Sequence, residues 1–217
     1  MLPRKGNNFF FLLFGLLITL LLAPIGWNRF DGIVTIAFTA TLVVSVWSLA
    51  RTKWAYYAGL TLAVISVVIS AIEFGTHWPS LVVVPSAVAF AFCLLSMTIA
   101  LREVVFDTGV DANRIAGAVS VYLLLGLNWA FAYKFLLLAD PGAFTGLGTG
   151  PGEPFLHLLY YSFVTLTTLG YGDISPISPV ARALSYLEAV SGVMYVAILV
   201  ASLVGSIRAG SDRSNEA

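Results

Sequence analysis

Apolar residues in this chain fall into six long runs separated by short polar segments. The runs lie near residues 9–23, 32–50, 56–72, 81–101, 115–138 and 181–207. A helix needs about 20 mostly apolar residues to cross the hydrocarbon core of a bilayer, and each run reaches or approaches that length. The pattern therefore predicts an all-α membrane protein with six transmembrane helices.

The first run has an alternative interpretation. Arg4 and Lys5 precede residues 9–23, as the basic start of a secretory signal peptide would. A small-residue cleavage site of the Ala-x-Ala kind does not follow the run, however. We therefore favour a first membrane helix over a cleaved signal.

Basic residues are distributed unevenly between the two sides of a six-helix arrangement. One side would carry Arg4, Lys5, Arg51, Lys53, Arg102, Arg114, Arg208 and Arg213, and the other only Arg29, Lys134 and Arg182. Cytoplasmic loops of membrane proteins carry an excess of lysine and arginine. The bias predicts a multi-pass protein of the cell membrane with both termini in the cytoplasm.

The segment between the fifth and sixth runs differs from the other connections. It is rich in glycine up to Gly152, and Pro154 then opens a short apolar run at residues 155–168. Proline suits the first turn of a helix. The run is too short to span a bilayer, and the glycines at 170 and 172 end it, so the pattern predicts a re-entrant helix.

The residues after this short run are Thr167-Thr168-Leu169-Gly170-Tyr171-Gly172-Asp173. They resemble the signature of potassium channels, usually TTVGYGD, with Leu169 where valine is commoner. The resemblance implies a homotetramer in which four copies of this loop form a selectivity filter. Potassium ions would then be bound by the carbonyls of Thr168, Leu169, Gly170 and Tyr171 and by the Thr168 hydroxyl.

Consecutive carbonyls can point toward one axis only if the backbone alternates between conformations of opposite hand. Glycine adopts the left-handed conformation without a Cβ penalty, which accounts for Gly170 and Gly172 in the filter. Tyr171 is expected to point away from the axis and brace the filter. Asp173 is expected at the outer mouth, where a ring of carboxylates would concentrate cations.

Residues 181–205 resemble the inner helix of bacterial channels of the two-helix type, and residues 119–133 resemble their outer helix. Gly192 matches the position of the gating hinge in that family. Close helix packing is the alternative reason for a glycine there. Val196, Val200 and Val204 follow at four-residue steps on one face, and we expect them to line the inner constriction.

Glu188 is the one acidic residue deep inside the sixth run. A charge near the bilayer centre costs about 2.5–3.5 kcal/mol, so such a residue usually has a purpose. We expect Glu188 to support the filter by bonding pore-helix hydroxyls such as Thr167, with Arg182 as an ionic partner. A neutral carboxyl at a subunit interface is the alternative.

Six helices with a pore between the last two is also the layout of voltage-gated channels. Voltage sensors place arginine or lysine along their fourth helix, but residues 80–101 contain no charged residue. The predicted layout is therefore a four-helix transmembrane region at 1–101 whose fourth helix is uncharged, a cytoplasmic linker at 102–113, a pore domain at 114–208 and a short cytoplasmic tail at 209–217.

Composition narrows the function further. The chain is 59% hydrophobic and 10% charged, and its formal net charge is zero, which gives no indication of a nucleic-acid partner. One cysteine and two distant histidines make no metal cluster, and no catalytic cluster or cofactor motif is found. We predict a potassium channel subunit that conducts passively and is not conventionally voltage-gated. The alternative is a modulatory or weakly selective cation channel subunit that co-assembles with other pore subunits.

Overall fold

The computed structural model describes residues 9–26, 57, 61, 64–65, 83–106, 111–148 and 154–215. Five helices occupy most of these residues: α1 (Phe9–Gly26), α4 (Val83–Phe106), α5 (Ala112–Ala139), α6 (Pro154–Leu166) and α7 (Pro179–Asn215). Two short strands, β1 (Phe144–Thr145) and β2 (Ser175–Pro176), pair antiparallel. The chain is therefore mostly helical, as predicted. The predicted runs at 32–50 and 56–72 lie almost entirely outside the described residues.

Two of the described helices are long and apolar enough to cross a membrane, Ala112–Ala139 and Pro179–Gly205. The apolar parts of α1, α4 and α6 are shorter. The fifth and sixth predicted membrane helices thus have the expected length and composition. The short α6 between them matches the predicted re-entrant helix.

Helix boundaries follow from local capping. At the start of α5, the Asp111 side chain accepts a hydrogen bond from the Arg114 N–H at 2.7 Å. At the start of α7, the Ser178 hydroxyl oxygen accepts from the Ala181 N–H at 3.2 Å, and Pro179 takes the first helical position. Helix α4 runs on to Phe106, past the predicted end at residue 101, because nothing in 102–106 breaks a helix.

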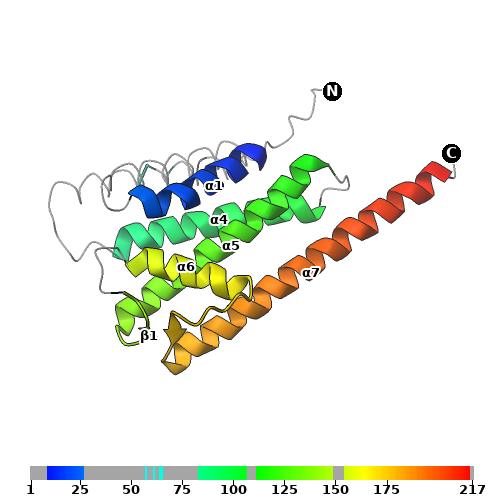
Figure 1. Cartoon of the computed structure of the whole chain (residues 1–217). Helices are drawn as coiled ribbons and strands as arrows, with labels where there is room; N and C mark the ends of the chain where they lie inside the picture. The colour runs from blue at the N-terminus through cyan, green and yellow to red at the C-terminus, as the bar shows by residue number, and fades with distance from the viewer. Residues whose placement is uncertain are drawn as a thin grey trace.

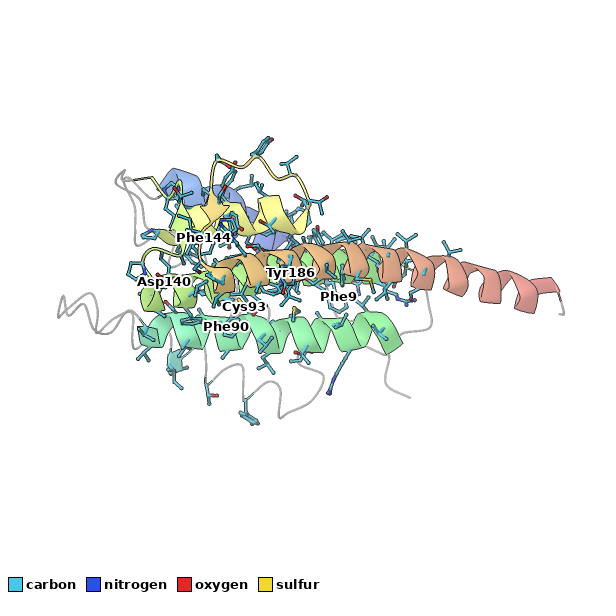
Figure 2. The ribbon with its side chains drawn as sticks, turned by 90° about the horizontal axis from the view of Figure 1, so that it is seen from below. Phe9, Phe90, Cys93, Asp140, Phe144 and Tyr186 are labelled. Atoms are coloured by element: carbon cyan, nitrogen blue, oxygen red, sulfur yellow. The ribbon has the colours of Figure 1, made fainter. Side chains whose placement is uncertain are left out.

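Helix α5 lies at the centre of the described structure and contacts α1, α4, α6 and α7 (Figure 1). On one side it packs with α1 and α4 around buried residues that include Leu12, Phe92 and Leu124. Phe90 and Cys93 project from α4 into this contact (Figure 2). Gly117 leaves room for the Phe9 ring, since a Cβ there would lie 3.0 Å from it.

A second cluster of buried residues lies where α5, α6, the two strands and the start of α7 meet. Tyr133 and Tyr161 lie in its centre, with ring centroids 5.1 Å apart, and Phe144 packs edge-on against both rings. The strands and this cluster join the segment after α5 to the segment before α7. They therefore fix the far end of the loop that follows α6.

Candidate ion pathway

Helix α6 ends at Leu166, and the next residues fold back toward its last turn. The N–H groups of Leu169 and Gly170 both donate to the Val164 carbonyl, at 2.9 and 3.3 Å. The Thr168 N–H donates to the Thr165 carbonyl at 2.9 Å. These bonds use carbonyls that a helix end would otherwise leave unpaired, and they attach the start of the loop to α6.

The backbone of this loop alternates in hand. Thr168, Gly170 and Gly172 have φ values of +58°, +60° and +79°, whereas Leu169 and Tyr171 between them are not in the left-handed region. The alternation expected from the glycine spacing is therefore present, and it also includes Thr168. A threonine with positive φ is strained, because its branched side chain crowds the backbone.

Residues 167–173 are exposed in the single chain. A Cβ added at Gly170 or Gly172 would meet no atom within 4 Å, and the Tyr171 side chain is 67% exposed. The bracing role expected for Tyr171 stays a prediction. Asp173 follows Gly172 directly, and its carboxylate interacts electrostatically with the Tyr160 side chain of α6.

The loop directly follows the carboxyl-terminal end of α6, and this position has an electrostatic consequence. The last carbonyls of a helix carry partial negative charge, which favours cations near that end. The sequence of residues 168–172 adds further backbone carbonyls to the same region. This end of α6 therefore favours a cation over an anion.

Glu188 lies behind α6 and is fully buried. Its Oε1 is 2.5 Å from the Ser162 hydroxyl of α6, and its Oε2 is 2.5 Å from the Tyr133 hydroxyl of α5. Glu188 thus bonds a pore-helix hydroxyl, as expected, but that hydroxyl is Ser162. The choice of Thr167 is wrong, since the Thr167 hydroxyl donates to the Phe163 carbonyl in the last turn of α6. The expected ion pair with Arg182 is also absent, because the Arg182 Nε donates to the Pro176 carbonyl.

Comparison with known proteins identifies the region that contains these features. Residues 118–209 match the model of a protein family described as "Ion channel". A two pore potassium channel c of Oryza sativa subsp. japonica is 36% identical over 86 residues, covering 40% of this chain and 17% of that protein. This part of the chain is similar to an ion channel family and to potassium channels.

Two further relatives are also potassium channels. The inward rectifier potassium channel Kirbac3.1 of Paramagnetospirillum magnetotacticum is 32% identical over 104 residues, 43% of this chain and 31% of that protein. The two-pore potassium channel 5 of Arabidopsis thaliana is 30% identical over 87 residues, 40% of this chain and 19% of that protein. The matches thus span less than a third of each relative, so the likeness concerns the pore.

Within this part of the chain, α7 passes close to the end of α6 at Gly192. A Cβ at Gly192 would collide with the Leu166 carbonyl and lie 2.9 Å from its Cδ1. The Leu166 carbonyl also accepts a hydrogen bond from the Tyr122 hydroxyl at 3.2 Å. Close helix packing therefore explains the glycine at position 192, and α7 continues as one helix through this position. The hinge stays a prediction.

The predicted gate residues lie beyond this contact. Val196, Val200 and Val204 are 46%, 54% and 46% exposed in the single chain. They leave an apolar row open on α7, as a lining of a pore between copies would require. The single chain does not test what they face.

Sequence reasoning missed several residues that hold α7 in place. The Trp129 indole donates to the Ser191 hydroxyl at 3.2 Å, and the Tyr195 hydroxyl donates to the Ala118 carbonyl at 2.7 Å. Near the far end, the Arg114 guanidinium donates to the Val104 carbonyl at 2.8 Å and to the Ser202 hydroxyl at 3.3 Å. Of these residues, only Arg114 stood out in the sequence, because it is a lone basic residue at the start of an apolar run.

Proposed function

We propose that this protein is a potassium-selective channel subunit that conducts K⁺ passively through a homotetrameric pore. One observation carries the proposal: the alternating left-handed residues at 168, 170 and 172, placed directly after the carboxyl end of α6. Such a backbone can turn successive carbonyls to the same side. Four copies around an axis would then replace the hydration shell of K⁺.

The proposed ion ligands are the carbonyls of Thr168, Leu169, Gly170 and Tyr171, with the Thr168 hydroxyl at the inner end. Gly172 completes the filter, and the Asp173 carboxylates would form a ring at the outer mouth. Leucine at 169 supports the same chemistry as valine, since the ligand there is the backbone. The exposure of this loop in one chain is consistent with a site that four chains complete.

Glu188 and Thr167 would support the filter in different ways. Through Ser162 and Tyr133, Glu188 attaches the inner helix to the pore helix and the outer helix. Thr167 caps the last turn of α6 with its hydroxyl. Both contacts would limit movement of the filter relative to the helices that surround it.

The gate would lie on α7, below Gly192. A bend at this glycine would move Val196, Val200 and Val204 toward or away from the axis. Replacing Val204 with Asp should raise the open probability, because a charged ring attracts water into an apolar constriction. Single-channel recordings of Val204→Asp that match those of the unchanged protein would remove Val204 from the gate.

The N-terminal region would not act as a conventional voltage sensor. Helix α4 carries its first charged residue at Arg102, near its end, so little charge could move through the field. We place the protein in the cell membrane as a multi-pass subunit with both termini in the cytoplasm. No cofactor is required, because K⁺ is the permeant ion.

The deciding experiment is reconstitution of the purified protein into planar bilayers under opposed potassium and sodium gradients. A reversal potential that follows the potassium gradient supports the proposal. A reversal potential that ignores it overturns potassium selectivity. Conduction by the homomer dismisses the alternative of a modulatory subunit that needs other pore subunits.

A matched pair of glycine variants tests the filter itself. Gly170→Ala places a side chain at φ +60°, where an L-residue is strained, and should abolish potassium-selective current. Gly142→Ala lies outside the filter, where a Cβ would meet only the Asp140 Oδ1 at 3.5 Å, and should conduct normally. Equal currents from both variants would contradict the filter assignment.

A further inference from the structure

The carboxyl of Glu188 joins three helices at one buried point. It extends from α7, and its partners are Ser162 on α6 and Tyr133 on α5. Glu188 and Ser162 are both 0% exposed, as is Tyr133. Water from either side therefore does not reach this carboxyl in the described structure, and its hydrogen bonds must come from the protein.

The Ser162 hydroxyl has two partners. It is 2.5 Å from Glu188 Oε1 and 2.8 Å from the carbonyl oxygen of Gly126 on α5. A carbonyl oxygen can only accept, and a hydroxyl has a single proton to donate. If Ser162 donates to Gly126, then Glu188 itself must donate to Ser162.

Counting protons over the whole cluster gives the same answer. Three oxygen–oxygen contacts need three protons: Tyr133 with Glu188, Glu188 with Ser162, and Ser162 with Gly126. The two hydroxyls supply two protons. The third proton is available only if the carboxyl of Glu188 carries it.

The surroundings of Glu188 give no compensation for a negative charge. The ionisable side chains that face it are Tyr122 and Tyr133 from α5 and Tyr161 from α6. Among the described residues, no lysine, arginine or histidine forms an ion pair with it. A buried carboxylate without a cationic partner is strongly unfavourable, so the neutral acid fits this site.

We propose that Glu188 is a proton-binding site, in which the carboxylic acid donates to Ser162 and accepts from Tyr133. The Ser162 hydroxyl in turn donates to the Gly126 carbonyl, so the proton on Glu188 completes a chain of hydrogen bonds between α5, α6 and α7. Removal of this proton would turn the Ser162 hydroxyl toward Glu188, break its bond to the Gly126 carbonyl and place a charge between the helices. The pore would then be loosened by alkaline conditions at a point directly behind α6. The inference concerns the folded pore and does not depend on whether the pore selects potassium.

Infrared spectroscopy of the purified protein at neutral pH tests the proposal directly. A protonated carboxyl has a C=O stretch well separated from that of a carboxylate. We expect such a band in the unchanged protein and in Asp140→Asn, and its loss in Glu188→Gln. If Glu188→Gln instead removes carboxylate bands and leaves the acid region unchanged, the proposal is wrong.

A second variant keeps the test informative if Glu188→Gln does not fold. Ser162→Ala retains Glu188 but removes the acceptor of its proton, so the acid band should persist and move to higher frequency. An ionised Glu188 would give no acid band in either protein. That outcome would overturn the proposal.

Stability against pH provides an independent readout. The folded state holds the proton, so raising the pH should lower the thermal midpoint of the unchanged protein. Glu188→Gln should lack this loss, because its amide can donate to Ser162 and accept from Tyr133 at any pH, while the nearby tyrosines are retained in both proteins. The same alkaline loss in both proteins would assign it to the tyrosines and contradict the proposal.

Discussion

The two described helices that are long and apolar enough to cross a membrane, α5 and α7, differ sharply in how much of their surface the chain itself covers. Each contains a strongly apolar stretch of 18 residues, yet 61% of that stretch is buried in α5 and only 11% in α7. Helix α5 is packed against α1, α4 and α6, whereas the distal part of α7 extends past the other helices (Figure 1, Figure 2).

The difference shows that hydropathy predicts which helices could cross a membrane but does not predict whether protein or lipid surrounds them. Helix α7 contacts its own chain through one narrow face, whose polar and small residues are Ser185, Glu188, Ser191 and Gly192. Its remaining surface is apolar and open, with Val193, Ile198 and Val200 each more than half exposed. Lipid or other copies of the chain would cover that surface, as the proposed tetramer requires.

The largest loss of stability should follow a substitution on the buried face of α5. Leu124 is 2% exposed, and Leu124→Ala should lower the free energy of unfolding by about 2–3 kcal/mol. This lies at the low end of values for soluble cores, because lipid lessens the transfer contribution while the cavity remains. Thermal unfolding in detergent measures it. A loss no larger than that of an exposed residue would contradict the central position of α5.

At Gly192, α7 packs closely against another helix of the same chain, as α5 does. Gly192→Ala should lower stability by about 1–3 kcal/mol, because the added Cβ meets the Leu166 backbone and overpacks the contact. Gly205→Ala is the matched control on the same helix, since nothing lies within 4 Å of a Cβ there. The control should be neutral or slightly stabilising. If both variants unfold at the same temperature, α7 does not approach α6 as described.

Substitution of Arg114 tests whether its hydrogen bonds hold the exposed half of α7 in position. Arg114→Met removes the bonds to the Val104 carbonyl and the Ser202 hydroxyl, and should cost about 1–2 kcal/mol. Hydrogen exchange should increase in residues 198–205 more than in residues 185–192, which have other contacts. Arg102→Met, at an exposed position, is the control and should leave both segments unchanged.

The smallest effect in a single chain should be at Val200, which is 54% exposed. Val200→Ala should change the stability of the dissociated subunit by less than about 0.5 kcal/mol. If four copies assemble around α7, the same variant should have a larger effect on the assembled protein. Equal effects in both states, measured with and without dissociating detergent, would argue that Val200 does not line an interface or pore.

Much of the pore could be predicted from the sequence. The length of the fifth and sixth apolar runs predicted two long helices, and the short run after Pro154 predicted α6. The alternation of backbone hand follows from glycines at every second position, because only glycine adopts positive φ without strain. The positive φ of Thr168 had no such signal, since its side chain disfavours that conformation.

The partners of Glu188 could not be read from the sequence in the same way. Its depth in an apolar run indicated a purpose, but two candidate hydroxyl partners lie close together, Ser162 on α6 and Thr167 directly after it. Which one faces Glu188 depends on the rotation of α6 against α7, which packing decides. Thr167 bonds to the last turn of α6, and Ser162 faces the carboxyl.

The sequence by itself determined the apolar lengths, the short helix after Pro154 and the glycine spacing of the loop at 168–172. These are local properties, set by hydropathy and by the backbone freedom of single residues. Only the tertiary structure decided that Gly192 packs on Leu166, that Arg114 reaches Ser202 and that Ser162 and Tyr133 enclose Glu188. Those contacts join residues distant in the chain, and their geometry depends on how whole helices rotate and cross.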